Sequence, residues 1–322
     1  MKNSTKHRHI NANILALCLI VFCWDVAIAE TTPGCGASAQ VQRFACQFDL
    51  QDDFFVSKAQ CLDNSVTDET CIDNAEVDFD EGTEECDDIL EARLDICESL
   101  DDATHDPEFG EAFAANFVDP LQIGISVAPN PWFPLVTGNR WLYEADEESI
   151  EVVVTDKTKL IDGIDCVVVV DTESEDGVVV EITNDWYAQD TTGNVWYCGE
   201  IARNFESFEG DDPEEIELVD IDGSWKSGRD GSEAGILLPF TPVEGDVIRQ
   251  EVSFGEAEDV IEILSITASE SSAGGDCLQT ADTTPLEPDA EENKYYAPGI
   301  GLIVEVDIET GDRVELIEFV AR

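Results

Sequence analysis

The architecture of this chain is most visible in residues 35–97, which read CGASAQVQRFACQFDLQDDFFVSKAQCLDNSVTDETCIDNAEVDFDEGTEECDDILEARLDIC. Six cysteines stand here at successive intervals of 11, 15, 10, 15 and 11 residues, a series that is almost a palindrome. At about 100° per residue, intervals of 11 and 15 return a side chain to within about 20° and 60°, so each half can place three cysteines on one helical face. The spacing predicts two antiparallel helices.

Nested disulfides between these helices would pair Cys35–Cys97, Cys46–Cys86 and Cys61–Cys71. Six cysteines allow 15 pairings, and the palindromic spacing favours the nested one. The second helix is the better supported, over residues 83–100, with acids early and Arg93 late. The bridges are expected to be structural, because the region has few large apolar side chains. A cysteine metal site is the alternative, but the region has no CxxC pair.

Residues 1–29 have the pattern of a secretory signal. Lys2, Lys6 and Arg8 precede an apolar run over 14–24, and small residues stand at 27–29. A membrane anchor is the alternative, but an apolar run of about 11 residues is well short of the roughly 20 needed to span a bilayer. We therefore expect cleavage near Ala29 and a secreted or periplasmic protein. Nine cysteines then remain, so at least one thiol is free, modified or paired with another molecule.

The charge of the chain restricts its partners. It has 73 Asp and Glu against 16 Lys and Arg, a formal net charge of -57. Nucleic acid and anionic membranes are poor partners for such a surface, because like charges repel and no basic stripe neutralises phosphates. Divalent cations fit better, and so does a saline medium, in which a Debye length of about 3 Å at 1 M salt mutes self-repulsion.

A proline-rich stretch at 120–134 divides the chain by composition. Before it we expect a cysteine-rich helical module over 30–119, and after it an antiparallel β domain over 135–322, because short β-branched and aromatic runs alternate there with turns such as Asp162-Gly163 and Asp176-Gly177. The predicted fold class is therefore α+β: a small disulfide-stapled helical N-terminal module followed by a mainly antiparallel β domain, built as a curved sheet, half-barrel or sandwich.

An internal duplication is one option for the β domain. A proline-led turn, a cysteine and an aromatic strand follow one another at Pro134, Cys166 and Trp186, with intervals of 32 and 20 residues. The same order recurs at Pro242, Cys277 and Tyr295, with intervals of 35 and 18. Duplication of a half-sheet would make Cys166 and Cys277 equivalent, either bridged or separately buried, whereas convergence on common hairpin chemistry remains the alternative. The pairing of Cys198 is open.

Several short motifs carry a resemblance that covers most of residues 130–305. They are Asn130-Pro131-Trp132-Phe133-Pro134-Leu135, Asp185-Trp186-Tyr187-Ala188-Gln189-Asp190, Gly193-Asn194-Val195-Trp196-Tyr197, Gly255-Glu256-Ala257-Glu258-Asp259, Thr284-Pro285-Leu286-Glu287-Pro288 and Lys294-Tyr295-Tyr296-Ala297-Pro298-Gly299-Ile300-Gly301-Leu302. With these the chain resembles an uncharacterised family of secreted, often acidic bacterial proteins. The last motif also resembles a hairpin of periplasmic half-barrel proteins. The resemblance implies export and a β architecture, and no activity.

Catalytic motifs are scarce in the sequence. Once the signal is removed, His105 is the one histidine left, among acids and in an expected solvated loop, and no GxSxG, SxxK, HExxH or GxGxxG motif occurs. A carboxylate pair is the device that the composition allows, because glycosidases need two acids about 5–10 Å apart. The candidates are Glu256, Glu258 and Asp259, with an ordinary strand edge as the alternative. An enzyme is the less favoured reading.

Two further sets of residues are candidates for binding. Residues 206–222 hold nine acids, among which Asp211, Asp212, Glu214, Asp220 and Asp222 could bind calcium weakly, although no EF-hand pattern occurs and a solvated loop is the alternative. Trp186, Trp225 and Tyr295 could line a ligand groove, with core packing as the alternative, because adjacent strand residues point to opposite faces. No cofactor other than such a cation is expected.

These observations favour an exported acidic protein that acts by binding or as a structural component of the envelope or extracellular space. One alternative is a β half-barrel that carries an apolar ligand. The other is a carboxylate-dependent hydrolase, which needs two close acids with separated pKa values in a cleft.

Overall fold

The computed structural model describes residues 33–63, 69–145, 148–208, 210–271 and 275–322. The predicted signal segment lies outside these residues. In the described part of the chain, no helix combines the length and the apolar character needed to cross a membrane.

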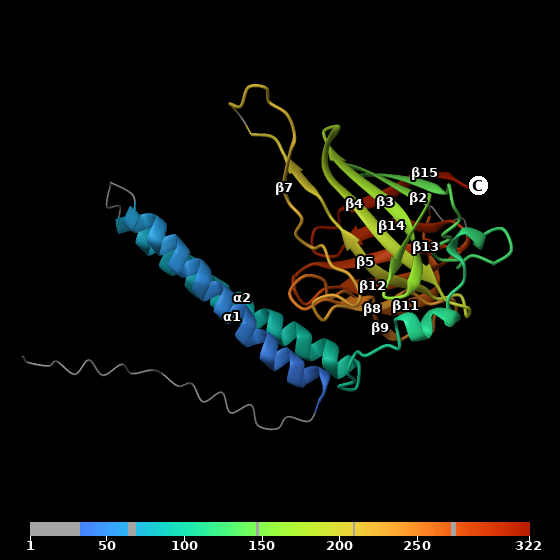
Figure 1. Cartoon of the computed structure of the whole chain (residues 1–322), viewed down its shortest axis with the longest axis horizontal. Coiled ribbons are helices and arrows are strands. Elements are labelled where there is room, and N and C mark those ends of the chain that lie inside the picture. Colours follow the sequence, from blue (N-terminus) through green and yellow to red (C-terminus); the bar gives the residue numbers. More distant parts are fainter. Residues whose placement is uncertain (1–32, 64–68, 146–147, 209, 272–274) are drawn as a thin grey trace, which may run out of the picture. The chain divides into compact units, whose positions relative to one another are not determined.

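A helical hairpin opens the described chain (Figure 1), formed by α1, Cys35–Asp63, and α2, Glu69–Ser99. The three nested disulfides are confirmed: Cys35–Cys97, Cys46–Cys86 and Cys61–Cys71 join the helices with Cα–Cα distances of 5.4, 5.9 and 5.8 Å. Helix α2 begins 14 residues before the predicted start at residue 83. Between the bridges the hairpin is packed by aromatic contacts, such as that of Phe54 with Phe79 at 5.0 Å between ring centroids.

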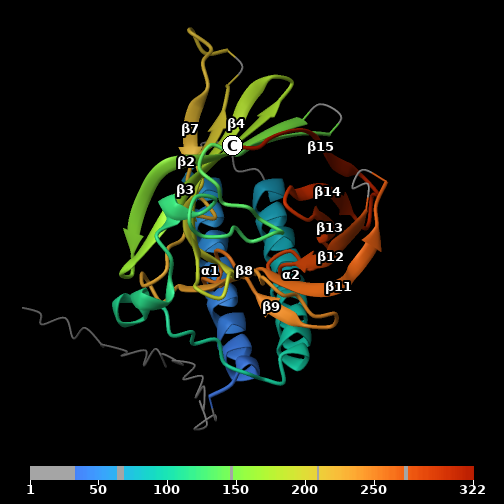
Figure 2. The ribbon, with the colours of Figure 1, turned by 90° about the vertical axis from the view of Figure 1, so that its right-hand side faces the viewer.

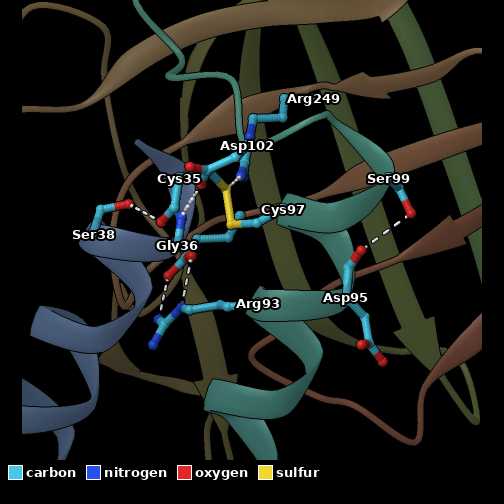
Figure 3. The surroundings of a disulfide bond; sticks show 10 residues. Cys35, Gly36, Ser38, Arg93, Asp95, Cys97, Ser99, Asp102 and Arg249 are labelled. Atoms are coloured by element: carbon cyan, nitrogen blue, oxygen red, sulfur yellow. Dashed lines mark hydrogen bonds and ion pairs between the residues drawn. A yellow bond between two sulfur atoms is a disulfide. The ribbon is translucent and has the colours of Figure 1, made fainter. Parts of the chain in front are cut away.

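The open end of the hairpin is closed by the chain that leaves α2. The backbone amide of Gly36 donates to the Asp102 carboxylate at 2.7 Å, and the amide of Cys35 donates to the Asp102 carbonyl. Figure 3 shows Asp102 beside the Cys35–Cys97 bridge, with Arg249 of the β domain next to it. The Arg249 guanidinium donates to the Cys35 sulfur at 2.9 Å. The first disulfide is thus in contact with both parts of the fold.

Two short 3-10 helices, η1 Glu111–Asn116 and η2 Pro120–Gln122, lead into the β domain. The proline-rich segment that follows packs against the sheet. Ile123 and Leu135 belong to the main hydrophobic core, and the fully buried Asn130 side chain donates to the Gly193 carbonyl at 2.9 Å while its own carbonyl oxygen accepts from the amide of Trp132. These contacts anchor the first strand of the sheet.

The β domain is a large antiparallel sheet that is nearly closed into a barrel. Its strands are β1 Arg140–Ala145, β2 Glu148–Ile161, β3 Ile164–Glu175, β4 Val178–Gln189, β5 Val195–Ile201, β6 Asn204–Glu206, β7 Glu217–Asp220, β8 Glu233–Leu238, β9 Val247–Arg249, β10 Glu251–Val252, β11 Val260–Ser269, β12 Asp276–Thr283, β13 Glu291–Ala297, β14 Gly301–Asp307 and β15 Arg313–Val320. Figure 2 shows β2 and β3 on one side of the curve and β11 to β14 on the other.

The ends of the sheet meet through the chain itself. The strand order runs β10-β8-β5-β4-β3-β2-β1-β15-β14-β13-β12-β11-β9, with β6 and β7 beside β4. Strands β9 and β10 therefore lie at opposite ends of this order, yet Gln250 alone separates them in the sequence. One continuous segment, residues 247–252, pairs with β11 at its start and with β8 at its end. This passage closes the sheet around an interior.

The predicted Asp-Gly turns are confirmed, and the structure decides the pairing of the last cysteines. Asp162-Gly163 and Asp176-Gly177 form the tight turns of β2–β3 and β3–β4, with positive φ at all four residues, as a right-handed twist in the strands favours. Cys166 is bridged to Cys198, so the suggested bridge to Cys277 is wrong. Cys277 is buried and free. The four disulfides of the described residues are consistent with an extracellular or periplasmic protein.

Candidate functional site: an acid-lined cavity inside the barrel

A cavity of about 300 Å³ lies inside the barrel. One part of its wall is apolar and includes Leu302, Val152 and Val314. The other part is unusually rich in ionisable side chains: Asp171, Asp185, Glu251, Asp259, Asp282, Lys294 and Glu305. Asp259 also keeps part of its surface in contact with solvent. An interior with six carboxyl groups and one ammonium is not a packed core, and it is the best-formed candidate site in the described residues.

Strand alternation places these groups in the interior. On β4, Asp185 and Tyr187 line the cavity, whereas Trp186 lies on the opposite face in the cluster around the Cys166–Cys198 bridge. On the neighbouring strand β3, Val169 is paired with Asp185 and also lines the cavity. A shift of one residue in either strand would exchange the two faces.

A β-bulge brings Glu200 into contact with residues of this polar wall. Across β4 and β5, Trp186 is paired with Gly199 but Tyr187 is paired with Tyr197, so Cys198 is an extra residue on β5. Gly199 has φ of 128°, and a Cβ atom there would lie 2.5 Å from the Trp225 carbonyl oxygen, so glycine is required for this turn of the strand. The bulge allows two residues three positions apart, Tyr197 and Glu200, to contact Asp185.

The Tyr197 hydroxyl joins two carboxyl groups. Its oxygen lies 2.7 Å from Asp185 Oδ1 and 2.8 Å from Glu200 Oε2, and the two carboxyls are themselves in hydrogen-bonding contact. Burial raises the pKa of Asp185 to about 6, against the opposing effect of its hydrogen bonds. Burial and then the charge of Asp185 raise the pKa of Glu200 to about 8. Between these values the pair holds one proton.

A second carboxyl pair lies nearby, formed by Glu251 and Asp259. The Glu251 side chain is 1% exposed, and its Oε1 accepts from the Asp259 amide at 3.2 Å. Its Oε2 is buried and accepts no hydrogen bond, and among the described residues the Asp259 carboxyl is the one group close enough to share a proton with the Glu251 side chain. Burial and then the neighbouring Asp259 raise the pKa of Glu251 well above its usual range, and burial also raises the pKa of Asp259. This is a second pair of carboxyl groups inside the barrel for which burial disfavours the ionised form.

Lys294 is the one cation of the cavity wall. Its ammonium lies 3.5 Å from Asp282, 3.1 Å from Glu292 and 3.3 Å from Glu305. Burial works against its charge, but these carboxylates outweigh it and raise the pKa of Lys294. The lysine is therefore already compensated by these carboxylates. Its charge also acts on Asp259, whereas no cation of the described chain acts on Asp185, Glu200 or Glu251.

The predicted catalytic carboxylates are separated by the fold. Asp259 lines the cavity, and Glu256 is exposed on the turn before it. Glu258 is buried and accepts from Arg93 Nε of α2 at 3.0 Å and from the Gly255 amide at 2.9 Å. The structure gives Glu258 the role of joining the hairpin to the barrel.

The predicted aromatic residues do not line the cavity. Trp186 is buried under the Lys159 ammonium, 3.4 Å from the ring centroid, Trp225 is buried against Tyr197, and Tyr295 packs against the cluster around Cys277. Tyr187 and Tyr296, the chain neighbours of Trp186 and Tyr295, line it instead. The other aromatic residues of the cavity wall are Phe133, Tyr143 and Tyr197. Adjacent strand residues were expected to point to opposite faces, but the register that decides between them is not visible in the sequence.

The predicted calcium residues form no ion site in the structure. Asp220 lies on the exposed strand β7, where it accepts from Asn204 and from the Asp222 amide, and Asp211, Asp212 and Glu214 are exposed on the loop before it. Within the described ranges, no group of three or more His, Cys, Asp or Glu side chains is placed to hold a metal ion.

His105 is less solvated than predicted. Its Nε2 lies 3.0 Å from the Ala234 carbonyl, and burial lowers the pKa of His105. It packs on the outside of β8 and does not line the cavity.

Fold and cavity define the class of this protein: an antiparallel sheet nearly closed into a barrel, with a disulfide-stapled helical hairpin and an acid-lined interior. Comparison with protein-family models, with curated proteins and with solved structures found no match. The resemblance to secreted acidic bacterial proteins therefore stays a prediction.

Proposed function

We propose that this chain is exported and binds, inside its barrel, a small organic cation with an apolar body. The observation that carries the proposal is the buried Glu251 Oε2, which belongs to the cavity wall and receives no hydrogen bond from the protein when Glu251 is ionised. A buried carboxylate oxygen without a partner costs free energy, and a ligand that donates a charged hydrogen bond would recover it.

The remaining wall supports a ligand of this chemistry. Tyr187 and Tyr197 are stacked at 4.7 Å between centroids beside Asp185, and aromatic faces attract organic ammonium groups. Leu302 and Val314 offer apolar contact for the rest of the ligand. The volume is at the small end of ligand sites and equals the liquid volume of about ten water molecules, at about 30 Å³ each.

Calorimetric titration with benzylamine tests the proposal, with benzyl alcohol and benzoate as neutral and anionic probes of the same size. We expect benzylamine to bind best, and to bind more tightly as the pH rises from 5 to 8.5, because the carboxyls must lose their protons to pair with it. Glu251→Gln should weaken binding at least about 10-fold, since a buried charged pair is lost, and the exposed control Glu256→Gln should leave it unchanged.

The other outcomes are equally informative. Tighter binding of benzyl alcohol, with no effect of pH, would contradict a cationic ligand and favour the carrier of an apolar ligand. Binding of none of the three probes would contradict a small-ligand site. It would favour a structural role in the envelope or extracellular space.

A hydrolase is a second candidate, favoured by the Asp185–Glu200 pair. Two carboxyls that share one proton are the arrangement with which aspartic proteases activate water. The cavity limits such an activity to small substrates. Turnover of p-nitrophenyl esters or glycosides that is lost in Asp185→Asn would support this candidate, and equal turnover in the variant would exclude the pair as its cause.

A further inference from the structure

Helix α1 has apolar residues on two opposite faces. One face carries Cys35, Cys46 and Cys61 and packs against α2. The other carries Val41, Phe48, Phe55 and Leu62, which are 52, 65, 65 and 71% exposed. At about 100° per residue this second set lies about 170° around the helix from the cysteines. A helix with one partner needs one apolar face, so the second face is unexplained by the hairpin.

The exposed set repeats at intervals of seven residues. With Ala45, Asp52 and Ala59 between its members, it forms a row in which the spacing alternates between four and three residues: Val41, Ala45, Phe48, Asp52, Phe55, Ala59 and Leu62. We call these seven residues the α1 row. All seven are exposed, and no described residue covers them. This alternation, sustained over three heptads, is the pattern of a seam between two helices.

We propose that the α1 row is a dimer interface, in which α1 of one copy packs against α1 of a second copy. The seven-residue repeat fits a partner helix with the same repeat, and a second copy supplies it. A two-fold interface places the same patch on both sides, so that patch has to be low in charge.

Charge distinguishes α1 from the rest of this acidic chain. Helix α1 has four acids and two bases in 29 residues, whereas α2 has thirteen acids and one base in 31. The α1 row itself contains one ionisable residue, Asp52. A basic partner would be drawn to α2, whereas α1 is the surface on which two copies of a strongly negative chain can approach each other.

The size of the row is sufficient for a specific but modest interface. It runs from Val41 to Leu62, a rise of about 32 Å at 1.5 Å per residue. Covering its apolar side chains on two copies removes on the order of 1,000 Å² from water, close to the lower bound for specific interfaces. Asp52 lies at the centre of the row, where it faces Asp52 of the second copy. The repulsion between the two carboxylates weakens the dimer, and salt, which screens this repulsion, strengthens it.

Sedimentation velocity on the exported chain, from 1 to 200 μM in 0.5 M NaCl, tests the proposal. We expect a reversible monomer–dimer equilibrium. Phe48→Glu and Phe55→Glu should each weaken it at least about 30-fold, as for central aromatic residues of interfaces, and the exposed control Phe254→Glu on the barrel should not change it. Circular dichroism on each variant checks that the hairpin, held by its three disulfides, remains folded.

Asp52 provides a test in the opposite direction. Asp52→Leu should strengthen the dimer at least about 10-fold, because it replaces a like-charge contact with an apolar one. Asp53→Leu makes the same change one residue further, outside the row, and should leave the equilibrium unchanged. A monomer at all concentrations, or a dimer that neither Phe48→Glu nor Asp52→Leu affects, would overturn the proposal. So would a monomer whose flotation with phosphatidylcholine vesicles depends on Phe48, which would assign the row to a lipid surface.

Discussion

Helix α2 and the barrel interior both concentrate acids, in opposite surroundings. Of the thirteen acids of α2, the twelve whose side chains are described are all exposed. The barrel instead encloses six carboxyls around one cavity, with Lys294 as their one cation. In water and salt an exposed carboxylate stays ionised at little cost, whereas a buried one takes up a proton or pairs with a cation. The acids behind the net charge of -57 therefore have two different roles, one on the solvated surface and one inside the barrel.

The largest expected effect concerns the ion pair that joins these two regions. Arg93 and Glu258 have side chains 7 and 1% exposed. Arg93→Ala leaves the Glu258 carboxylate buried without its cation, which should cost about 3–5 kcal/mol of unfolding free energy. Urea denaturation, followed by tryptophan fluorescence of the barrel, measures the loss.

Arg43→Ala is the matched control, because Arg43 pairs with Asp87 on the exposed part of the hairpin. We expect a loss below about 1 kcal/mol there. Equal losses in the two variants would contradict the distinction between a buried and a solvated pair.

The second prediction uses pH to separate the buried acids from the exposed ones. The folded-state pKa of Glu200 is raised to about 8 and that of Asp185 to about 6, so the native barrel holds protons that the unfolded chain releases near pH 4. Their stabilising contribution is complete below pH 4 and is lost as the pH rises towards 8, at up to about 1.4 kcal/mol per pH unit for each group.

Thermal melting between pH 5 and pH 8.5 measures this slope. Wild type should lose stability as the pH rises, and Glu200→Gln, which cannot ionise, should flatten the curve between pH 6 and 8. The exposed control Glu256→Gln should keep the wild-type slope. An unchanged slope in Glu200→Gln would show that exposed acids cause the pH dependence.

The smallest expected effect is that of salt on α2. Like charges four residues apart, such as Glu81 with Glu85 and Glu84 with Asp88, destabilise a helix by about 0.2–0.5 kcal/mol per pair. Molar NaCl screens them, so melting followed by helical circular dichroism should move to higher temperature between 0.05 and 1 M NaCl. The shift should be reduced in Glu84→Gln. A melting temperature unchanged by salt would contradict this, and would leave the exposed acids as candidates for specific cation binding.

Much of the fold could be predicted because its signals are local or periodic. Cysteine spacing determines which faces of two helices can meet, and the three bridges of the hairpin followed from it. The Asp-Gly pairs at 162–163 and 176–177 marked tight turns, because these residues tolerate positive φ. The extension of α2 back to Glu69 was missed, since acids surround the short apolar stripe that Ile72, Ala75 and Phe79 form in its first turns.

The candidate site was accessible from the sequence only in part. Asp259 was found, but Asp185, Glu200 and Glu251 were indistinguishable from some 70 other acids. A buried acid has no local signal, because its environment is made by strands far away in the chain. The bulge at Cys198 and Gly199 decides that Glu200 turns inward, and the passage of residues 247–252 from one sheet end to the other decides that Glu251 does.

By itself, the sequence of this protein determined the hairpin, its bridges, the antiparallel strands and the net charge, from which poor binding of polyanions remains a prediction. These properties depend on spacing, turn chemistry and composition, which act within a few residues or over the whole chain. The tertiary structure alone decided which tyrosines and carboxyls enclose the cavity, which acid holds the hairpin to the barrel, and which face of α1 stays uncovered. Each of these depends on strand register and on contacts between distant segments, and burial then changes what an identical carboxyl group can do.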